Sequence, residues 1–95
     1  MDINYFQAKG LLDDEKALLV DVRSPEEFAQ TGINGALNIP LPELALKLDQ
    51  LGSDKDRPIV LYCRTGNRSG QAVTWLQQQG FSRLYNMGSY EVWED

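Results

Sequence analysis

The sequence contains Ile59-Val60-Leu61-Tyr62-Cys63-Arg64-Thr65-Gly66-Asn67-Arg68-Ser69-Gly70, in which an apolar run gives way to a short polar segment. The apolar run, residues 59–62, has the length and the β-branched content of a buried β-strand. Residues 69–79 are predicted to form a helix that stops at Gly80, because glycine commonly ends helices. The polar segment 63–68 is therefore expected to be a loop that connects the end of a strand to the start of a helix.

Strand and helix signals alternate along the rest of the chain. Further strands are predicted at residues 18–22, 36–39 and 84–87, with a short one beginning at Ile3. Helical segments are predicted at residues 5–12, from Ser24-Pro25 onward, along the leucine repeat of residues 41–51, and as a terminal turn at residues 90–94. Such alternation predicts an α/β fold with a mostly parallel sheet. Active sites in sheets of this kind lie beyond the carboxyl ends of the strands.

The size and charge of the chain restrict its possible partners. With 95 residues, of which 42% are hydrophobic and 24% charged, the sequence predicts a single domain over residues 1–95. A net charge of −5 repels phosphate backbones, so no nucleic-acid partner is expected. Residues 1–12 do not resemble a signal peptide, and no apolar run approaches the ~20 residues of a membrane span. We therefore expect a cytoplasmic location and no membrane partner, while the sequence leaves the oligomeric state open.

The chain has one cysteine, Cys63, and no histidine. A single cysteine cannot form an internal disulfide, and structural metal sites usually need several cysteine or histidine ligands, so no metal and no cofactor are expected. The absence of histidine excludes Cys–His and Ser–His catalytic pairs. Any chemistry at Cys63 must therefore be activated by backbone dipoles and arginine.

The loop around Cys63 has features that stabilise negative charge. Successive backbone N–H groups in such a turn can converge on one point, and the following helix adds the positive end of its dipole. Gly66 permits an unusual backbone angle, while Arg64 and Arg68 add positive charge. A lone cysteine at the end of a buried strand is usually a small core residue, but core filling does not explain these neighbours. The segment therefore predicts a reactive thiolate at Cys63, and the same surroundings would stabilise a persulfide.

The segment Leu61 to Ser69 resembles the active-site loop of the rhodanese family of sulfurtransferases. Residues 20–28 resemble the first signature of that family, residues 32–40 resemble its second, and residues 80–81 and 84–88 match the segment before its last helix. Together these segments cover nearly the whole chain in the order of the family. The resemblance implies a rhodanese-like, three-layer α/β/α fold with a central parallel sheet of about five strands. It also places the cysteine at the base of a shallow pocket.

The resemblance further implies a sulfurtransferase that moves sulfane sulfur through a persulfide on Cys63. A small anionic sulfur donor such as thiosulfate would load the cysteine, and cyanide, a thiol or a protein acceptor would unload it. Arg68 would anchor the loop, and Arg64 would attract the donor. The residues implied to bind the substrate and the persulfide are Arg64, Thr65, Gly66, Asn67, Arg68 and Ser69.

Two other functions remain open at this stage. Many domains that resemble the family are non-catalytic binding or regulatory modules, although these usually lack the cysteine. Small cysteine phosphatases and arsenate reductases resemble one another in having five residues between the cysteine and the arginine of a similar loop. Here four residues separate Cys63 from Arg68. The shorter loop favours a single sulfur atom over a tetrahedral oxyanion.

Charged residues at the end of the first long strand have a mainly structural interpretation. Asp21 and Arg23 follow the apolar run and are predicted to tie the strand to the next helix, with Arg23 reaching Glu26 or Glu27. A role of these side chains in the active pocket is the less favoured alternative.

The sequence departs from the family pattern at two places. The family often has histidine where Thr31-Gly32 stands, and a double glycine where Met87-Gly88 stands. Near the end of the chain, Tyr90 and Trp93 are expected to pack in the core or at the rim of the pocket. None of these positions carries the sulfur, so the departures do not exclude activity.

Overall fold

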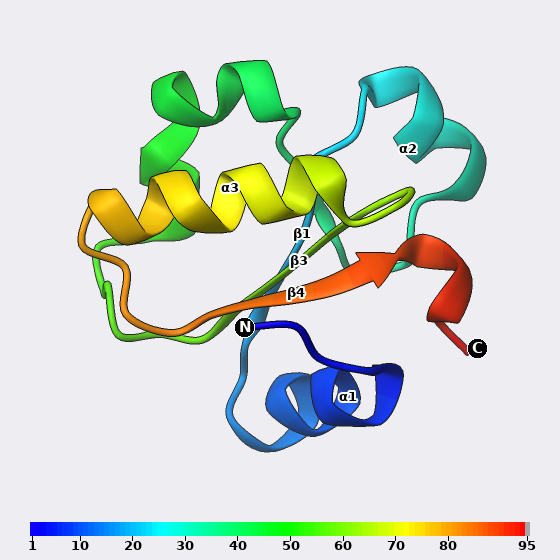
Figure 1. The fold of residues 1–95 in the computed structure, drawn as a ribbon, viewed down its shortest axis with the longest axis horizontal. Helices are drawn as coiled ribbons and strands as arrows, with labels where there is room; N and C mark the ends of the chain where they lie inside the picture. The colour runs from blue at the N-terminus through cyan, green and yellow to red at the C-terminus, as the bar shows by residue number, and fades with distance from the viewer. Residues whose placement is uncertain (95) are drawn as a thin grey trace.

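The computed structural model describes residues 1–94, and a parallel sheet of four strands forms its centre (Figure 1). The strands are β1 (Leu18–Asp21), β2 (Leu37–Asn38), β3 (Ile59–Cys63) and β4 (Leu84–Ser89). Their order across the sheet is β2-β1-β3-β4, and each neighbouring pair is parallel. An isolated parallel bridge between Asp2 and Asn86 adds to the edge at β4. The predicted parallel sheet is therefore confirmed, with four strands where about five were expected.

Helices cover both faces of the sheet and complete the three predicted layers. The helix α3 (Asn67–Gln78) and the 3-10 helix η1 (Leu41–Leu51) lie together on one face, and α1 (Tyr5–Asp14) lies on the other (Figure 1). The helix α2 (Pro25–Thr31) follows β1, and the 3-10 turn η2 (Tyr90–Val92) follows β4. Among residues 1–94, no helix combines the length and the apolar character needed to cross a lipid bilayer.

Side chains of β3 alternate between two buried layers, as expected for a strand covered on both faces. Ile59, Leu61 and Cys63 belong to the core under α3 and η1. Val60 and Tyr62 belong to the core on the side of α1. All five side chains are 0% exposed. Because Cys63 alternates in phase with Ile59 and Leu61, its side chain lies on the same face of the sheet as α3.

Side-chain caps fix where α1 and α2 begin. The Gln7 N–H donates to the side chain of Asn4, and the Asn4 N–H donates to the side chain of Gln7, both at 2.9 Å. Ser24 and Glu27 form the same reciprocal pair at the start of α2. Such capping boxes satisfy N–H groups that the helix itself leaves without partners. The helix start predicted at Ser24-Pro25 is therefore confirmed.

Several local predictions differ from the structure. Cys63, which was predicted to begin the loop, is the last residue of β3, and β4 extends to Ser89. The helix α3 begins at Asn67 and not at Ser69, because the preceding glycine takes a left-handed conformation and turns the chain into the helix at once. The leucine repeat of residues 41–51 forms a 3-10 helix, which is kinked because Lys47 has non-helical dihedral angles. The strand expected to begin at Ile3 is limited to the bridge described above, since the chain turns into α1 directly after it.

Leu61→Ala is expected to lower the free energy of unfolding by about 2–5 kcal/mol, because truncating a packed side chain leaves a cavity in the core. The same substitution at Leu46, whose side chain is 84% exposed, should change it by less than about 0.5 kcal/mol. Urea unfolding followed by circular dichroism measures both values. Similar losses in the two variants would contradict the assignment of Leu61 to the core.

Candidate active site

The loop after β3 folds back over the sulfur of Cys63. The Gly66 N–H donates to Cys63 Sγ at a distance of 3.0 Å, and the hydroxyl oxygen of Ser69 lies 3.3 Å from the same sulfur. Gly66 has φ +95° and ψ −9°, a left-handed conformation that glycine adopts without strain. The loop thus brings a main-chain N–H and a hydroxyl to one point at the start of α3.

The surroundings of Cys63 favour its thiolate form. Burial by itself raises the pKa of a thiol, because an apolar environment disfavours charge. Here hydrogen bonding outweighs burial: the Ser69 hydroxyl and the backbone N–H groups of residues 69, 65 and 66 lower the pKa of Cys63 below its ordinary value of 9.0. These N–H groups lie at the positive end of the α3 dipole. The sulfur can therefore become an anion without a neighbouring histidine.

Cys63 is 0% exposed, although its loop borders two cavities. One cavity of about 670 Å³ runs along α3 and is lined by Gly66, Asn67 and Trp75 among others. Another of about 380 Å³ lies next to β4 and is lined by Gly66, Asn67 and Asn86 among others. Cys63 lines neither of them. The resemblance implied that the cysteine lies at the base of a shallow pocket. In the structure the loop covers its sulfur instead, so the cysteine is not open to a pocket.

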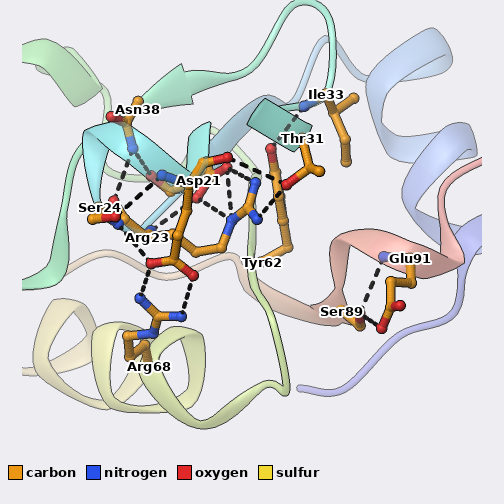
Figure 2. A network of polar contacts seen from close by, with 11 residues as sticks. Asp21, Arg23, Ser24, Thr31, Ile33, Asn38, Tyr62, Arg68, Ser89 and Glu91 are labelled. Atoms are coloured by element: carbon orange, nitrogen blue, oxygen red, sulfur yellow. Dashed lines mark hydrogen bonds and ion pairs between the residues drawn. The ribbon is translucent and has the colours of Figure 1, made fainter. Parts of the chain in front are cut away.

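Arg68 binds Glu27 in a bidentate ion pair. Its two terminal nitrogens lie 2.7 and 3.0 Å from the two carboxylate oxygens (Figure 2). Hydrogen bonding from Arg68 lowers the pKa of Glu27 to about 2. Since Glu27 also caps α2 through Ser24, the pair connects the first turn of α3 to the first turn of α2.

The other residues of the predicted binding loop differ in exposure. Arg64, Thr65 and Asn67 are exposed, whereas Ser69 is buried. Within residues 1–94, Arg64 takes part in no ion pair. The backbone of the loop therefore surrounds the sulfur, while the guanidinium of Arg64 remains available to solutes.

A buried ion pair lies at the end of β1. Arg23 and Asp21 are 1% and 0% exposed, and their closest nitrogen and oxygen atoms are 2.8 Å apart (Figure 2). Arg23 also donates to the hydroxyl oxygen of Thr31 at 2.8 Å. Its guanidinium carbon lies 4.4 Å from the centre of the Tyr90 ring. Arg23 therefore connects β1 to the end of α2 and to η2.

The partner predicted for Arg23 was wrong. Asp21, two residues away, and not Glu26 or Glu27, is its carboxylate partner. Glu27 is bound to Arg68, and Glu26 is exposed. Arg23 is instead buried with Asp21, whose carboxylate compensates for the loss of hydration.

The departure from the family pattern at Thr31 and Gly32 has a local explanation. The Thr31 hydroxyl accepts the hydrogen bond from Arg23. At Gly32, an added Cβ would lie 2.5 Å from both the ring and the carbonyl oxygen of Phe28, so a side chain does not fit. Tyr90 and Trp93 line a small cavity of about 140 Å³ beside these residues, and no residue of the Cys63 loop borders it.

Asn86 in β4 is a residue of this site that the sequence analysis missed. The Ser69 hydroxyl donates to Asn86 Oδ1 at 2.7 Å, and Asn86 Nδ2 donates to the carbonyl oxygen of Gly66 at 3.1 Å. Asn86 thus contacts both residues that touch the sulfur of Cys63. The available signal was a polar residue within the strand predicted at residues 84–87, but the sequence pattern did not show what its side chain contacts.

The sequence model of the Rhodanese-like domain matches residues 6–95. The chain belongs to the rhodanese-like domain family. It is 43% identical over 87 residues to a protein named sulfurtransferase from Allochromatium vinosum, covering 90% of this chain and 79% of that protein. It is 38% identical over 69 residues to thiosulfate sulfurtransferase PspE of Escherichia coli, covering 73% of this chain and 66% of that protein.

Solved structures agree with this membership. The human single-domain sulfurtransferase TSTD1 has a TM-score of 0.83 at 32% identity, covering 97% of this chain and 93% of that one. The predicted rhodanese-like fold is therefore confirmed. The names of these relatives support sulfur transfer as the class of activity of this rhodanese-like domain.

Gly66→Ala is expected to lower the free energy of unfolding by about 1–2 kcal/mol, because an L side chain is strained at φ +95°. It should also raise the pKa of Cys63, since relief of the strain moves the residue-66 N–H away from the sulfur. Thiolate absorbance followed against pH measures this change. Gly52→Ala is the matched control, with φ +84° and no atom within 4 Å of the added Cβ. Gly52→Ala should lose a similar free energy of unfolding and leave the pKa of Cys63 unchanged. An unchanged Cys63 pKa in Gly66→Ala would contradict the assignment of the Gly66 N–H as a donor to the sulfur.

Glu27→Gln is expected to destabilise the domain at neutral pH but not in strong acid. The folded-state pKa of Glu27 is about 2 against an ordinary value of 4.5, so its contribution is complete above pH 4.5 and is lost as the pH falls through about 2. The side chains of Arg68 and Glu27 are 37% and 33% exposed, so screening by solvent limits the contribution to about 1 kcal/mol.

Urea unfolding of the wild type and Glu27→Gln over this pH range tests the ion pair. Glutamine keeps the cap on α2, so the comparison isolates the charge. The control Glu43→Gln removes an exposed pair with Lys47 and should cost less. A difference between wild type and Glu27→Gln that does not shrink with falling pH would rule out the proposed cause.

Proposed function

We propose that this rhodanese-like domain transfers sulfane sulfur from thiosulfate to a thiophilic acceptor, with Cys63 as the carrier. The observation that carries the proposal is the 3.0 Å hydrogen bond from the Gly66 N–H to Cys63 Sγ. Such a donor favours an anionic sulfur, and both the thiolate and the persulfide are anions. The names of the relatives, sulfurtransferase and thiosulfate sulfurtransferase, support the same reaction.

The first step loads the cysteine. Cys63 releases its proton to solvent, and the thiolate attacks the outer sulfur of thiosulfate. A new S–S bond forms, the S–S bond of thiosulfate breaks, and sulfite leaves with the bonding electron pair. The persulfide carries one negative charge, as the thiolate did. The N–H groups of the loop therefore face the same net charge before and after the step.

The second step removes the outer sulfur from the Cys63 persulfide. Cyanide attacks the terminal sulfur of the persulfide, and the Cys63 thiolate leaves with the electron pair, which gives thiocyanate. A thiolate acceptor on a small molecule or a protein would take the sulfur in the same way and become a persulfide. The two steps balance in atoms and electrons without a redox cofactor.

The two arginines of the loop are suited to different roles. Arg64 is exposed and, within residues 1–94, takes part in no ion pair, so it can attract an anionic donor. Arg68 is neutralised by Glu27 and is suited to anchoring the loop. Because Cys63 is 0% exposed, the donor must displace part of the loop before it reaches the sulfur.

The purified wild-type chain, incubated with thiosulfate and cyanide, is expected to produce thiocyanate, and Cys63→Ala is expected to produce none. Mass spectrometry after thiosulfate alone should show one added sulfur atom that reduction removes. Because Cys63 is the chain's single cysteine, the variant is a complete control for this mass change. Undiminished turnover in Cys63→Ala would overturn the proposal.

The same preparation distinguishes the other functions. The four residues between Cys63 and Arg68 and the buried sulfur disfavour a phosphatase reaction. Robust release of phosphate from an aryl phosphate would favour a phosphatase over a sulfurtransferase. A wild-type chain that forms no persulfide with any donor, but still binds a partner protein, would indicate a non-catalytic module.

A further inference from the structure

The backbone fixes the orientation of the Asn86 side chain. The Gly88 N–H donates to Asn86 Oδ1 at 2.9 Å, and Asn86 Nδ2 donates to the carbonyl oxygen of Gly66 at 3.1 Å. Exchanging the oxygen and nitrogen would set the amide NH₂ against the Gly88 N–H and the amide oxygen against the Gly66 oxygen. Both contacts would be repulsive. Asn86 therefore presents its oxygen, and not its nitrogen, to Ser69.

This orientation determines where the Ser69 proton lies. Ser69 Oγ is 2.7 Å from Asn86 Oδ1, an oxygen that carries no hydrogen, so Ser69 must be the donor. A hydroxyl has one proton to donate. The 3.3 Å contact between Ser69 Oγ and Cys63 Sγ can then be a hydrogen bond only if the thiol S–H donates to the oxygen. A deprotonated sulfur has no proton for this contact, and its charge would face an oxygen lone pair.

We propose that Asn86 is a positioning residue that holds the Ser69 proton while Cys63 is a thiol, and that this proton turns toward the sulfur when the sulfur becomes anionic. After the turn, Asn86 Oδ1 still accepts from the Gly88 N–H, so the amide oxygen keeps one partner. Ser69 and Cys63 are both 0% exposed, so their own contact excludes solvent. The inference rests on the proposed function, in which Cys63 passes from thiol to thiolate and persulfide.

The charged groups around Cys63 are the same in every variant considered below. Arg68 of α3 is paired with Glu27 of α2, and Asp21 of β1 is paired with Arg23. Arg64 lies on the loop itself, and β4 contributes no charged side chain. A change in the acid dissociation constant of Cys63 after substitution of Asn86 therefore reflects the loss of neutral hydrogen bonds and not the loss of a charge.

Asn86→Ala tests the proposal through the direction of the effect. Without the amide oxygen, ionisation of Cys63 no longer breaks the neutral hydrogen bond from Ser69 to Asn86. The acid dissociation constant of Cys63 should therefore rise by up to roughly tenfold, the size of that neutral hydrogen bond. A purely structural role predicts the opposite: loosening Gly66 would move its N–H off the sulfur and lower the constant. Thiolate ultraviolet absorbance against pH measures the value, with Cys63→Ser as the blank for tyrosine.

The Ser69→Ala background shows whether the effect passes through the hydroxyl. There, Asn86→Ala should not raise the acid dissociation constant of Cys63, because residue 69 has no hydroxyl that could turn from Asn86 to the sulfur. A rise of the same size in that background, or a fall in the single variant, overturns the proposal.

The unsubstituted protein offers a second readout that does not require Asn86→Ala to fold. The S–H stretching band of Cys63 should lie at lower frequency than that of a free thiol, because the S–H donates to Ser69, and it should return toward the free value in Ser69→Ala. A wild-type band at the free-thiol frequency overturns the proposal. Neither measurement involves turnover, so failure of the sulfur-transfer assay and failure of this inference are separate results.

Discussion

The hydrogen bond from the Gly66 N–H to the sulfur of Cys63 forms only when three local structures are present together. β3 must end at Cys63, Gly66 must take its left-handed conformation, and α3 must begin at Asn67. The donor is a main-chain group, so it neither titrates nor depends on a flexible side chain. A chain without histidine can stabilise an anionic sulfur in this way because the backbone geometry supplies the positive dipoles.

Most of the charge near the loop stabilises the fold and is not free to act on a substrate. Asp21 compensates Arg23 inside the protein, and Glu27 compensates Arg68 between α2 and α3. Removing one partner of the buried pair would leave an uncompensated charge, which costs about 3–5 kcal/mol. The electrostatic character of the site therefore comes mainly from backbone dipoles, with Arg64 as the exposed cation beside them.

Sequence patterns predicted the elements that depend on neighbouring residues. The apolar run of β3 and the cap at Ser24 were both assigned correctly, since period, length and capping chemistry are local properties. The 3-10 form of η1 was not predicted, because leucines at helical spacing do not distinguish an α-helix from a kinked 3-10 helix. The early start of α3 also escaped prediction, because it follows from the conformation that Gly66 takes in the folded loop.

The sequence by itself determined that a strand leads into Cys63, that a glycine follows three residues later, and that a helix comes next, since these are facts of chain order. Only the tertiary structure decided which groups complete the site. Asn86 reaches Ser69 across 17 positions of the chain, and Glu27 reaches Arg68 across 41. Such partners depend on the order of strands in the sheet, with β3 between β1 and β4. Packing of distant segments sets that order, and no local periodicity encodes it.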